Sequence, residues 1–392
     1  MRALRADRAS ARGGGIPRRS ERGKIVEPVY KLISADSHVL EPPDLWASRV
    51  PEQYRDRAPR MERFADGDAW VLEGVDAPIN FGLNASAGMD PSAMKPWIKW
   101  EDVREGGHDP AGRLREQDRD FVDAEILYPT PRLSWSIAAN EDAGFHLTMV
   151  RAYNDWLAEY CGHAPERLCG VAMVPNCGVA EAVAELERAM ANPGIVGGLV
   201  SRYPHGDLEL QPEDDAMWEY AASTHLPLSI HVTLVAEMPS THGTKLPGDV
   251  RFYDVPKRIL QMVFSGALDR FPELQIVLAE VDCGWVPYFK EQIDDRYYRL
   301  GRGSGLKLAM PPSHYMDRNF LYTYITDHFA VRNRADIGVD RMMWSTDYPH
   351  VGADWPNSWR TIAADFSGVP DDERDLILAG NARRVYGLGA SR

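Results

Sequence analysis

The chain has 392 residues, 44% of them hydrophobic and 26% charged, and its formal net charge at pH 7 is −14. This composition is ordinary for a globular enzyme, and the acidic balance argues against nucleic acid as a partner. No apolar run approaches the roughly 20 residues that a membrane-spanning helix needs, so we expect no contact with a membrane.

The N-terminal segment differs in charge from the rest of the chain. Residues 1–24 contain eight Lys or Arg against Asp7 and Glu21, together with three consecutive glycines. They have no apolar stretch of the kind that a signal peptide carries. We predict that residues 1–27 form a disordered basic segment, either a flexible arm or the product of a misassigned start codon, and that residues 28–392 form a single domain.

From about residue 28 the chain alternates between strand-like and helix-like runs, which is typical of a parallel α/β sheet. Apolar runs predict eight strands, at residues 29–35, 124–128, 168–174, 195–200, 226–230, 274–279, 320–325 and 342–345. Helical periodicity predicts helices between them, at residues 113–122, 141–161, 179–190, 214–224, 256–271 and 285–300. Further helical stretches run to Tyr386. This order predicts a (β/α)8 TIM barrel.

Two long loops interrupt the predicted barrel. The first, about residues 40–108, follows the first strand and is irregular and rich in Trp, Met, Pro and Gly. A loop of this length in a compact domain is usually functional, so we interpret it as an insertion that covers the barrel mouth or contacts a partner subunit. The second loop, residues 232–250, carries Glu237, His242 and Lys245.

Four cysteines lie scattered along the chain, without any Cys-x-x-Cys spacing. They are Cys161, Cys169, Cys177 and Cys283. This pattern is typical of reduced thiols in a cytosolic protein and not of a disulfide framework or a zinc knuckle. The sequence therefore predicts a cytoplasmic location.

Three of the predicted strands are followed by side chains of the types that commonly bind metal ions. Asp36 and His38 follow the first strand, His231 follows the fifth, and Asp347 follows the eighth. Because the carboxyl ends of all strands in a TIM barrel meet at one mouth, we expect these residues to surround a shared cation. Taken alone, Asp347 would be interpreted as the cap of the turn at Pro349.

Other ionisable residues also follow predicted strands. Glu280 comes after the sixth strand, His328 after the seventh, and His350 three residues after Asp347. Each histidine is either a proton carrier or a turn residue bonded to backbone. Arg202, after the fourth strand, is either a partner for a substrate carboxylate, through its fork of donors, or a member of an ordinary salt bridge.

An ordered set of short motifs resembles the amidohydrolase superfamily. The motifs are Ala35-Asp36-Ser37-His38 with Glu41-Pro42, then Leu226-Pro227-Leu228-Ser229-Ile230-His231, Arg270-Phe271-Pro272-Glu273-Leu274, Ser345-Thr346-Asp347-Tyr348-Pro349-His350 and Gly380-Asn381-Ala382-Arg383 with the residues to Leu388. They cover roughly residues 30–388. The most similar branch contains aminocarboxymuconate-semialdehyde decarboxylase and the resorcylate-type decarboxylases.

The resemblance implies one divalent metal ion, held by Asp36, His38, His231 and Asp347. Two carboxylates and two imidazoles suit Zn²⁺ or Mn²⁺, and the acidic first ligand favours the harder ion. Many relatives have a histidine where this chain has Glu280. A glutamate shuttles protons if burial raises its pKa, but it cannot donate as a cationic imidazole does. We therefore expect Glu280, His350 or His328 to replace that histidine, unless its role is lost.

Two reactions fit such a metal site. In one, metal-bound water attacks an amide, ester or lactone carbonyl, with Asp347 as the base. In the other, the metal chelates a substrate carboxylate and a neighbouring oxygen, while Asp347 protonates the carbon that loses carbon dioxide. The resemblance favours the second, a non-oxidative decarboxylation of a small aromatic or unsaturated carboxylic acid. Hydrolysis is the alternative, and a relative that binds a metal or ligand without turnover is a third. Oligomers are usual in this branch, so we predict a homodimer or higher homo-oligomer.

Overall fold

The computed structural model describes residues 30–234, 249–301 and 303–389. The predicted basic segment at residues 1–27 lies outside the described residues, as does the part of the second loop with Glu237, His242 and Lys245. No helix in the described ranges is long and apolar enough to cross a membrane.

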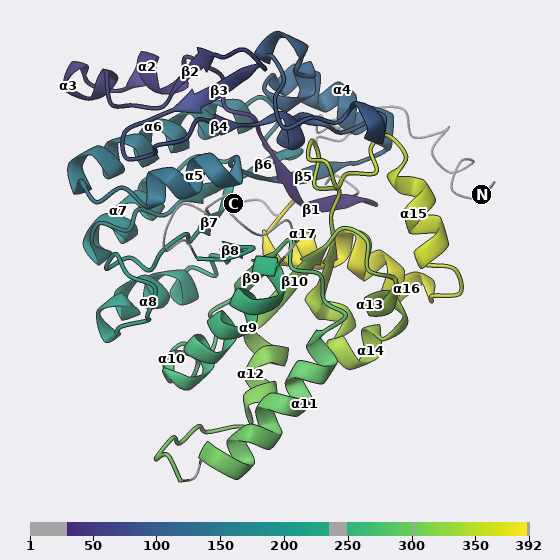
Figure 1. Cartoon of the computed structure of the whole chain (residues 1–392). Helices are drawn as coiled ribbons and strands as arrows, with labels where there is room; N and C mark the ends of the chain where they lie inside the picture. Colours follow the sequence, from purple (N-terminus) through teal and green to yellow (C-terminus); the bar gives the residue numbers. More distant parts are fainter. Residues whose placement is uncertain (1–29, 235–248, 302, 390–392) are drawn as a thin grey trace, which may run out of the picture.

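Eight parallel strands form the centre of the protein, with helices around them (Figure 1). Each strand pairs with its neighbour in chain order. The strands are β1 (Ile33–His38), β5 (Ala124–Tyr128), β6 (Leu168–Met173), β7 (Ile195–Leu199), β8 (Leu228–His231), β9 (Ile276–Ala279), β10 (Phe320–Tyr324) and β11 (Met342–Trp344). This arrangement confirms the predicted (β/α)8 barrel. All eight strands are buried throughout, as expected for strands covered on both faces.

The barrel closes between its first and last strands through backbone hydrogen bonds. The amide of Asp347 donates to the carbonyl oxygen of Asp36 at 3.0 Å, and the amide of His38 donates to that of Tyr348 at 2.7 Å. β1 therefore extends through His38, further than the predicted 29–35, because its last residues still pair with β5. The two ends of the sheet are joined where the metal-ligand motifs lie.

Helices cover the outside of the barrel. The principal ones are α4 (Pro110–Asp120), α5 (Pro131–Ala138), α6 (Ala143–Cys161), α7 (Val179–Met190), α8 (Asp215–Ser223), α9 (Asp249–Phe264), α11 (Val286–Arg296), α12 (Pro312–Asn319), α15 (Ser358–Asp365) and α17 (Asn381–Val385). Shorter helical segments are α10 (Ala267–Arg270), α13 (His328–Arg332), α14 (Arg334–Ile337) and α16 (Asp371–Asp375). The prediction missed α5 and α12 and began the helix after the second loop at Pro256, which lies inside α9.

Sequence periodicity and end signals explain the longest of these helices. Along α6, Phe145, Met149 and Tyr153 repeat every four residues and are buried against the sheet. The helix starts after Asp142, whose carboxylate accepts hydrogen bonds from the amides of Gly144 and Phe145. Such a cap satisfies backbone donors that the first turn leaves without partners.

The insertion after β1 is more ordered than the sequence indicated. It contains α2 (Leu45–Arg49), α3 (Glu52–Arg55) and an antiparallel sheet of β2 (Arg60–Arg63), β3 (Asp68–Val71) and β4 (Ile79–Asn80). The buried rings of Trp46 and Trp70 pack edge to face, with centroids 5.4 Å apart. These aromatic side chains belong to a hydrophobic cluster that the insertion shares with α6, through Phe145 and Met149. We missed the sheet because its strands are only two to four residues long.

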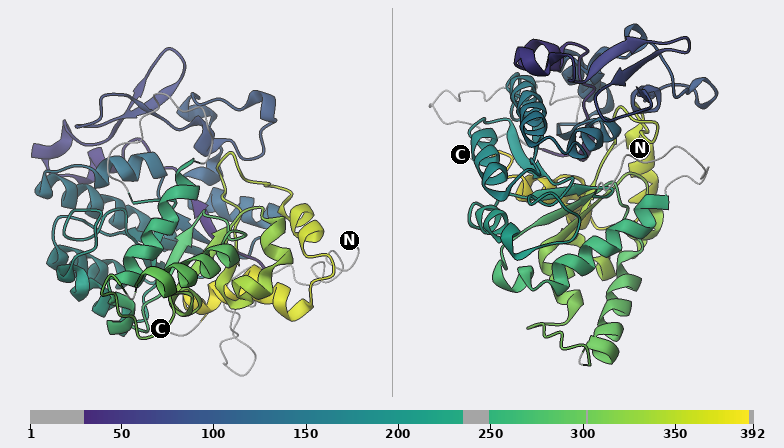
Figure 2. Two further views of the ribbon diagram at one scale, coloured as in Figure 1. Left: turned by 60° about the horizontal axis from the view of Figure 1, so that its bottom comes forward. Right: turned by 60° about the vertical axis from the view of Figure 1, so that its left-hand side comes forward.

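The insertion lies at one end of the molecule, and α11 and α12 project at the other (Figure 2). From the insertion, the short 3₁₀ helix η1 (Gly82–Ala85) reaches the barrel mouth. There the amide of Val351 donates to the carbonyl oxygen of Leu83, and that of Ala87 donates to the carbonyl oxygen of Pro349, both within 2.9 Å. The insertion is thus hydrogen-bonded to the loop that follows β11.

Candidate metal centre

Six ionisable side chains meet at the carboxyl ends of the barrel strands. They are Asp36, His38, His231, Glu280, Asp347 and His350. Each is between 0% and 8% exposed. Burying several carboxylates together is unfavourable unless they are paired with positive charge or hold a metal ion. The group is therefore a candidate metal centre.

The first part of the cluster joins β1 to β8. His38 Nε2 lies 3.1 Å from His231 Nε2, and Asp36 Oδ1 lies 3.6 Å from the first nitrogen and 3.5 Å from the second. Within the described part of the chain, Asp36 Oδ1 accepts no hydrogen bond although it is fully buried. A buried oxygen without a donor, facing two imidazole nitrogens, fits a cation between the three groups.

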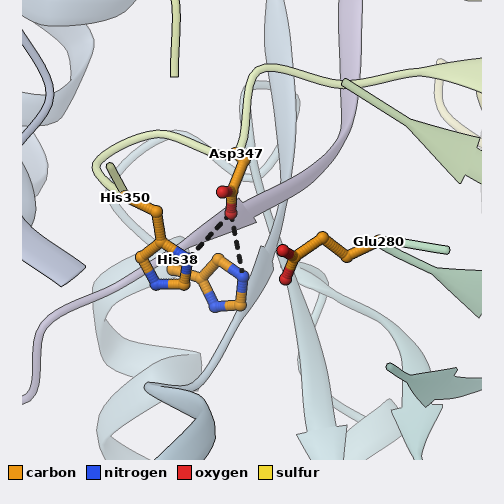
Figure 3. Close-up of side chains that lie close together, drawn as sticks. All are labelled: His38, Glu280, Asp347 and His350. Carbon is orange, nitrogen blue, oxygen red and sulfur yellow. Dashed lines mark ion pairs between the residues drawn. The ribbon is translucent and has the colours of Figure 1, made fainter. Parts of the chain in front are cut away.

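The second part of the cluster comes from the loops after β9 and β11 (Figure 3). Asp347 Oδ1 lies 3.4 Å from His38 Nε2 and 2.8 Å from His350 Nδ1. Glu280 extends its carboxylate toward the same space, with Oε2 3.4 Å from His231 Nε2. The rings of His38 and His350 stack with centroids 3.8 Å apart. The structure thus brings together all four predicted ligands, along with Glu280 and His350.

The backbone is strained where strands deliver these side chains. Asp347 and Glu280 have φ angles of 55° and 56°, and Val232, directly after His231, has 59°. Positive φ is unfavourable for residues other than glycine, at a cost of about 1–3 kcal/mol each, and such strain concentrates at functional sites. The abrupt turns direct the side chains into the barrel mouth instead of along the strand.

Neighbouring polar groups hold the cluster in position. His38 Nδ1 donates to the carbonyl oxygen of Pro129 at 2.9 Å, which leaves Nε2 for a metal. Thr323 Oγ1 donates to Asp36 Oδ2 at 3.2 Å. Asn84 Nδ2, from η1 of the insertion, donates to His350 Nε2 at 3.1 Å, so Nδ1 of that ring carries its proton toward Asp347.

Burial and mutual charge set the protonation of the three histidines. Burial, with the neighbouring histidines, lowers the pKa of His38 well below its ordinary value. It also lowers the pKa of His350 to about 4. Burial alone would lower the pKa of His231 too, but the carboxylates of Asp36, Glu280 and Asp347 raise it. The site therefore carries carboxylates beside neutral imidazoles at His38 and His350, which suits the binding of a metal cation, while His231 would release its proton to the ion's charge.

Two predicted site residues are placed elsewhere. His328 is at the start of α13, with a side chain that is 62% exposed, and it pairs with Asp365 on α15. Arg202 donates to the carbonyl oxygen of Gly206 at 3.4 Å. The side chain of His328 therefore faces α15 and not the cluster.

Sequence reasoning missed three residues that support the site. Asn84 lies in an insertion whose sequence gives no sign of which segment reaches the barrel mouth. Thr323 could have been found, because it lies on a predicted strand close to its carboxyl end. Arg113 was assigned only to a helix, yet it is fully buried and bonded to the backbone of His38.

Comparison with known proteins identifies relatives over most of the chain. The family model for Amidohydrolase matches residues 36–388. A gamma-resorcylate decarboxylase of Polaromonas sp. (strain JS666) is 26% identical over 330 residues, covering 76% of this chain and 94% of that protein.

Two solved structures share the fold. An amidohydrolase of Mycobacterium avium subsp. paratuberculosis K-10 has a TM-score of 0.74 at 18% identity, covering 92% of this chain and 98% of that one. A dihydroxybenzoic acid decarboxylase of Polaromonas sp. JS666, solved with bound manganese and an inhibitor, has a TM-score of 0.60 at 20% identity, covering 93% and 98%.

Proposed function

The chain belongs to the amidohydrolase family, and on that premise we propose that it is a metal-dependent decarboxylase of a small aromatic or unsaturated carboxylic acid. The observation that carries the proposal is the buried cluster at the barrel mouth, where His38 Nε2 lies within 3.6 Å of donor atoms of Asp36, His231 and Asp347. The relative from Polaromonas, a decarboxylase of gamma-resorcylate, supports the choice of reaction.

We assign the metal ligands to Asp36, His38, His231 and Asp347. The orphaned Oδ1 of Asp36 and the neutral imidazole of His38 fit a divalent ion. Two carboxylates and two imidazoles accommodate either Mn²⁺ or Zn²⁺, and we expect Mn²⁺ because the solved dihydroxybenzoic acid decarboxylase of Polaromonas contains manganese. When bound, the ion supplies a Lewis acid that holds and polarises the substrate carboxylate.

The protein must provide a proton as well as a binding site. Decarboxylation breaks a carbon–carbon bond, carbon dioxide leaves, and the carbon that keeps the electron pair must be protonated. We assign proton delivery to Asp347, because its Oδ1 lies 2.8 Å from His350 Nδ1 and 3.4 Å from His38 Nε2. His350 orients its carboxylate, and Asn84 fixes the orientation of that ring. The exposed side chain of His328 leaves its predicted catalytic role without geometric support.

The burial of the cluster suits this chemistry. The cluster residues are almost inaccessible, and η1 of the insertion is bonded across the loop that carries His350. Exclusion of water strengthens electrostatic contacts with a substrate carboxylate and limits competing reactions of a carbanion-like centre. Pairing of a substrate carboxylate with Arg202, which donates to the carbonyl oxygen of Gly206, stays a prediction.

The experiment is product analysis of purified protein that has been stripped with a chelator and reloaded with Mn²⁺ or Zn²⁺. Gamma-resorcylate, the substrate named for the relative, and a panel of other hydroxybenzoates serve as probes. Metal-dependent release of one carbon dioxide per acid consumed is the expected result. Hydrolysis of esters or lactones without carbon dioxide release would replace this proposal with the hydrolase alternative.

We also propose a homodimer in the cytoplasm. The aromatic residues of the insertion turn inward, so the support for association comes instead from exposed Tyr288, Tyr298 and Leu300, on α11 and the turn after it. The four free cysteines support a reducing compartment. Light scattering coupled to gel filtration tests the first part of this proposal, and cell fractionation tests the second.

A further inference from the structure

We propose that Glu280 is a fifth ligand of the metal ion, which gives the site three carboxylates and two imidazoles and makes it selective for Mn²⁺ over Zn²⁺. This inference rests on the metal centre proposed above and extends it. The four-ligand assignment left Glu280 without a role, and the geometry points to direct coordination.

The first argument is the spacing of the donor atoms. Atoms that share one ion at about 2.1 Å lie about 3.0–3.4 Å from each other, depending on whether the site is octahedral or tetrahedral. Glu280 Oε2 is 3.4 Å from His231 Nε2. That separation equals the 3.4 Å between Asp347 Oδ1 and His38 Nε2. Glu280 also belongs, with His38, Asp347 and His350, to a group whose donor atoms all lie within 4.8 Å of one another, and Asp36 and His231 form a second such group with the same His38.

The second argument is the way Glu280 is anchored. Its amide donates to Thr323 Oγ1 at 2.7 Å, and that hydroxyl donates to Asp36 Oδ2 at 3.2 Å. Thr323 therefore holds both the backbone of Glu280 and the Oδ2 atom of Asp36 in position. The other oxygen, Asp36 Oδ1, is the buried acceptor without a donor, and it faces the same nitrogen of His231 as Glu280 does.

The third argument is the backbone conformation that Glu280 shares with Asp347. Both residues have the left-handed φ that is unfavourable for residues with a Cβ atom. Glu280 directly follows β9, Asp347 lies three residues after β11, and both direct a carboxylate to the centre of the mouth (Figure 3). His231, the last residue of β8, pairs with Ala279, the last residue of β9. Glu280 therefore lies one residue beyond the position that pairs with His231.

The consequence concerns the choice of metal. Four ligands that include two imidazoles are typical of tetrahedral Zn²⁺. A fifth protein ligand, and a third carboxylate, favours an octahedral ion with oxygen ligands, such as Mn²⁺. Glu280 is then a metal ligand at the position where many relatives have a histidine, and it determines which ion binds.

The experiment measures metal binding without substrate. Wild-type protein, Glu280→Gln and Glu280→Asp are stripped with a chelator and titrated with Mn²⁺ and Zn²⁺ against a chromophoric competitor. Substitutions beside a metal site weaken binding by about 10–100-fold, so loss of a ligand should weaken Mn²⁺ binding by about 100-fold or more. We expect Zn²⁺ binding to weaken less. X-ray absorption of the Mn²⁺ form should show one oxygen ligand fewer in Glu280→Gln.

A matched control is Glu185→Gln. Glu185 is also a fully buried carboxylate, but it lies on α7 and accepts a hydrogen bond from the side-chain amide of Asn154. Its substitution should leave both affinities within about twofold of wild type. The melting temperature of each metal-free variant establishes that it is folded. If Glu280→Gln does not fold, the shortened carboxylate of Glu280→Asp is expected to weaken Mn²⁺ binding selectively.

The outcomes separate this inference from the proposal on which it rests. Wild-type protein that binds neither ion would remove the metal centre and the role of Glu280 together. If wild-type protein binds Mn²⁺ and folded Glu280→Gln binds it equally well, Glu280 is not a ligand. The four-ligand centre would then remain in place. Equal weakening of both ions would retain Glu280 as a ligand but overturn its role in selectivity.

Discussion

Arg113 donates a hydrogen bond of 2.8 Å to the main-chain carbonyl oxygen of His38. The same guanidinium donates to the carbonyl oxygen of Tyr348 at 3.2 Å and pairs with Glu125 at 2.6 Å. Since Tyr348 directly follows Asp347, one buried side chain holds the strand ends on both sides of the barrel closure. Arg113 lies on α4, outside the sheet, and contacts backbone instead of the cluster itself.

Replacing Arg113 should therefore affect both stability and metal binding. Arg113→Met leaves Glu125 as an unpaired buried carboxylate, which costs about 3–5 kcal/mol of unfolding free energy. It also frees the carbonyls that position two ligands, so metal affinity should fall by about 10–100-fold. Urea denaturation of the metal-free protein and a metal titration measure the two effects. Arg49→Met, which breaks the exposed pair with Glu159, should cost less than about 1 kcal/mol and leave metal binding unchanged.

Asp347 is the residue on which the proposed reaction depends most. Asp347→Asn keeps the size of the side chain, but it removes a proton carrier and weakens a ligand. Loss of a general acid alone lowers turnover by about 10²–10⁴-fold, and we expect at least that loss in carbon dioxide release, with a native circular dichroism spectrum. Asp340→Asn, just before β11 and 55% exposed, is the control with full activity. Wild-type rates in Asp347→Asn would remove this residue from the mechanism.

His38 and His146 form a matched pair for testing the ligand assignment. Both are buried, and in both Nδ1 donates to a backbone carbonyl oxygen at 2.9 Å. His38 Nε2 faces the cluster, whereas His146 Nε2 accepts from the amide of Asn176. Both alanine variants should lose stability, but only His38→Ala should lose its metal during purification, as measured by mass spectrometry of metal content. Full occupancy in His38→Ala would mean that the ligand set is wrong.

Most of what could be predicted about the site came from the polar residues at the ends of the predicted strands. The Asp-x-His spacing of Asp36 and His38 places both side chains on one face of β1, and the barrel brings His231 and Asp347 to the same mouth. Because parallel strands buried on both faces are continuous apolar runs, their positions were recognisable within a few residues. The polar residues that end them were therefore conspicuous.

The remaining features depend on tertiary contacts that leave no local pattern. Asn84 touches His350 only because the insertion folds back over the mouth, and nothing in its neighbouring residues indicates that path. Arg113 looks like an ordinary surface residue of a helix until the barrel closes beneath it. Strands of two to four residues, as in β4, are too short for alternation to be visible.

A buried carboxylate distant from the ligands provides a test of pH dependence. Asp120 ends α4 and accepts hydrogen bonds from the amide and hydroxyl of Ser358, at the start of α15. Those bonds favour its ionised form, but burial outweighs them and raises its pKa from the ordinary 3.8 to about 6. The folded protein thus keeps a proton at pH values where the unfolded chain has released it.

The stability that this proton gives is complete below about pH 4 and is lost as the pH rises through about 6, because the folded carboxyl then ionises too. Between pH 4.5 and 7 the loss should be about 2 kcal/mol from this one group. Asp120→Asn has no proton to lose, and its amide can donate to the hydroxyl of Ser358. The difference in unfolding free energy between wild type and variant should therefore change by about 2 kcal/mol over the same pH range. Urea denaturation at several pH values, with Asp118→Asn as the exposed control on the same helix, measures it. Parallel pH profiles for wild type and Asp120→Asn would show that this carboxyl titrates normally in the folded protein.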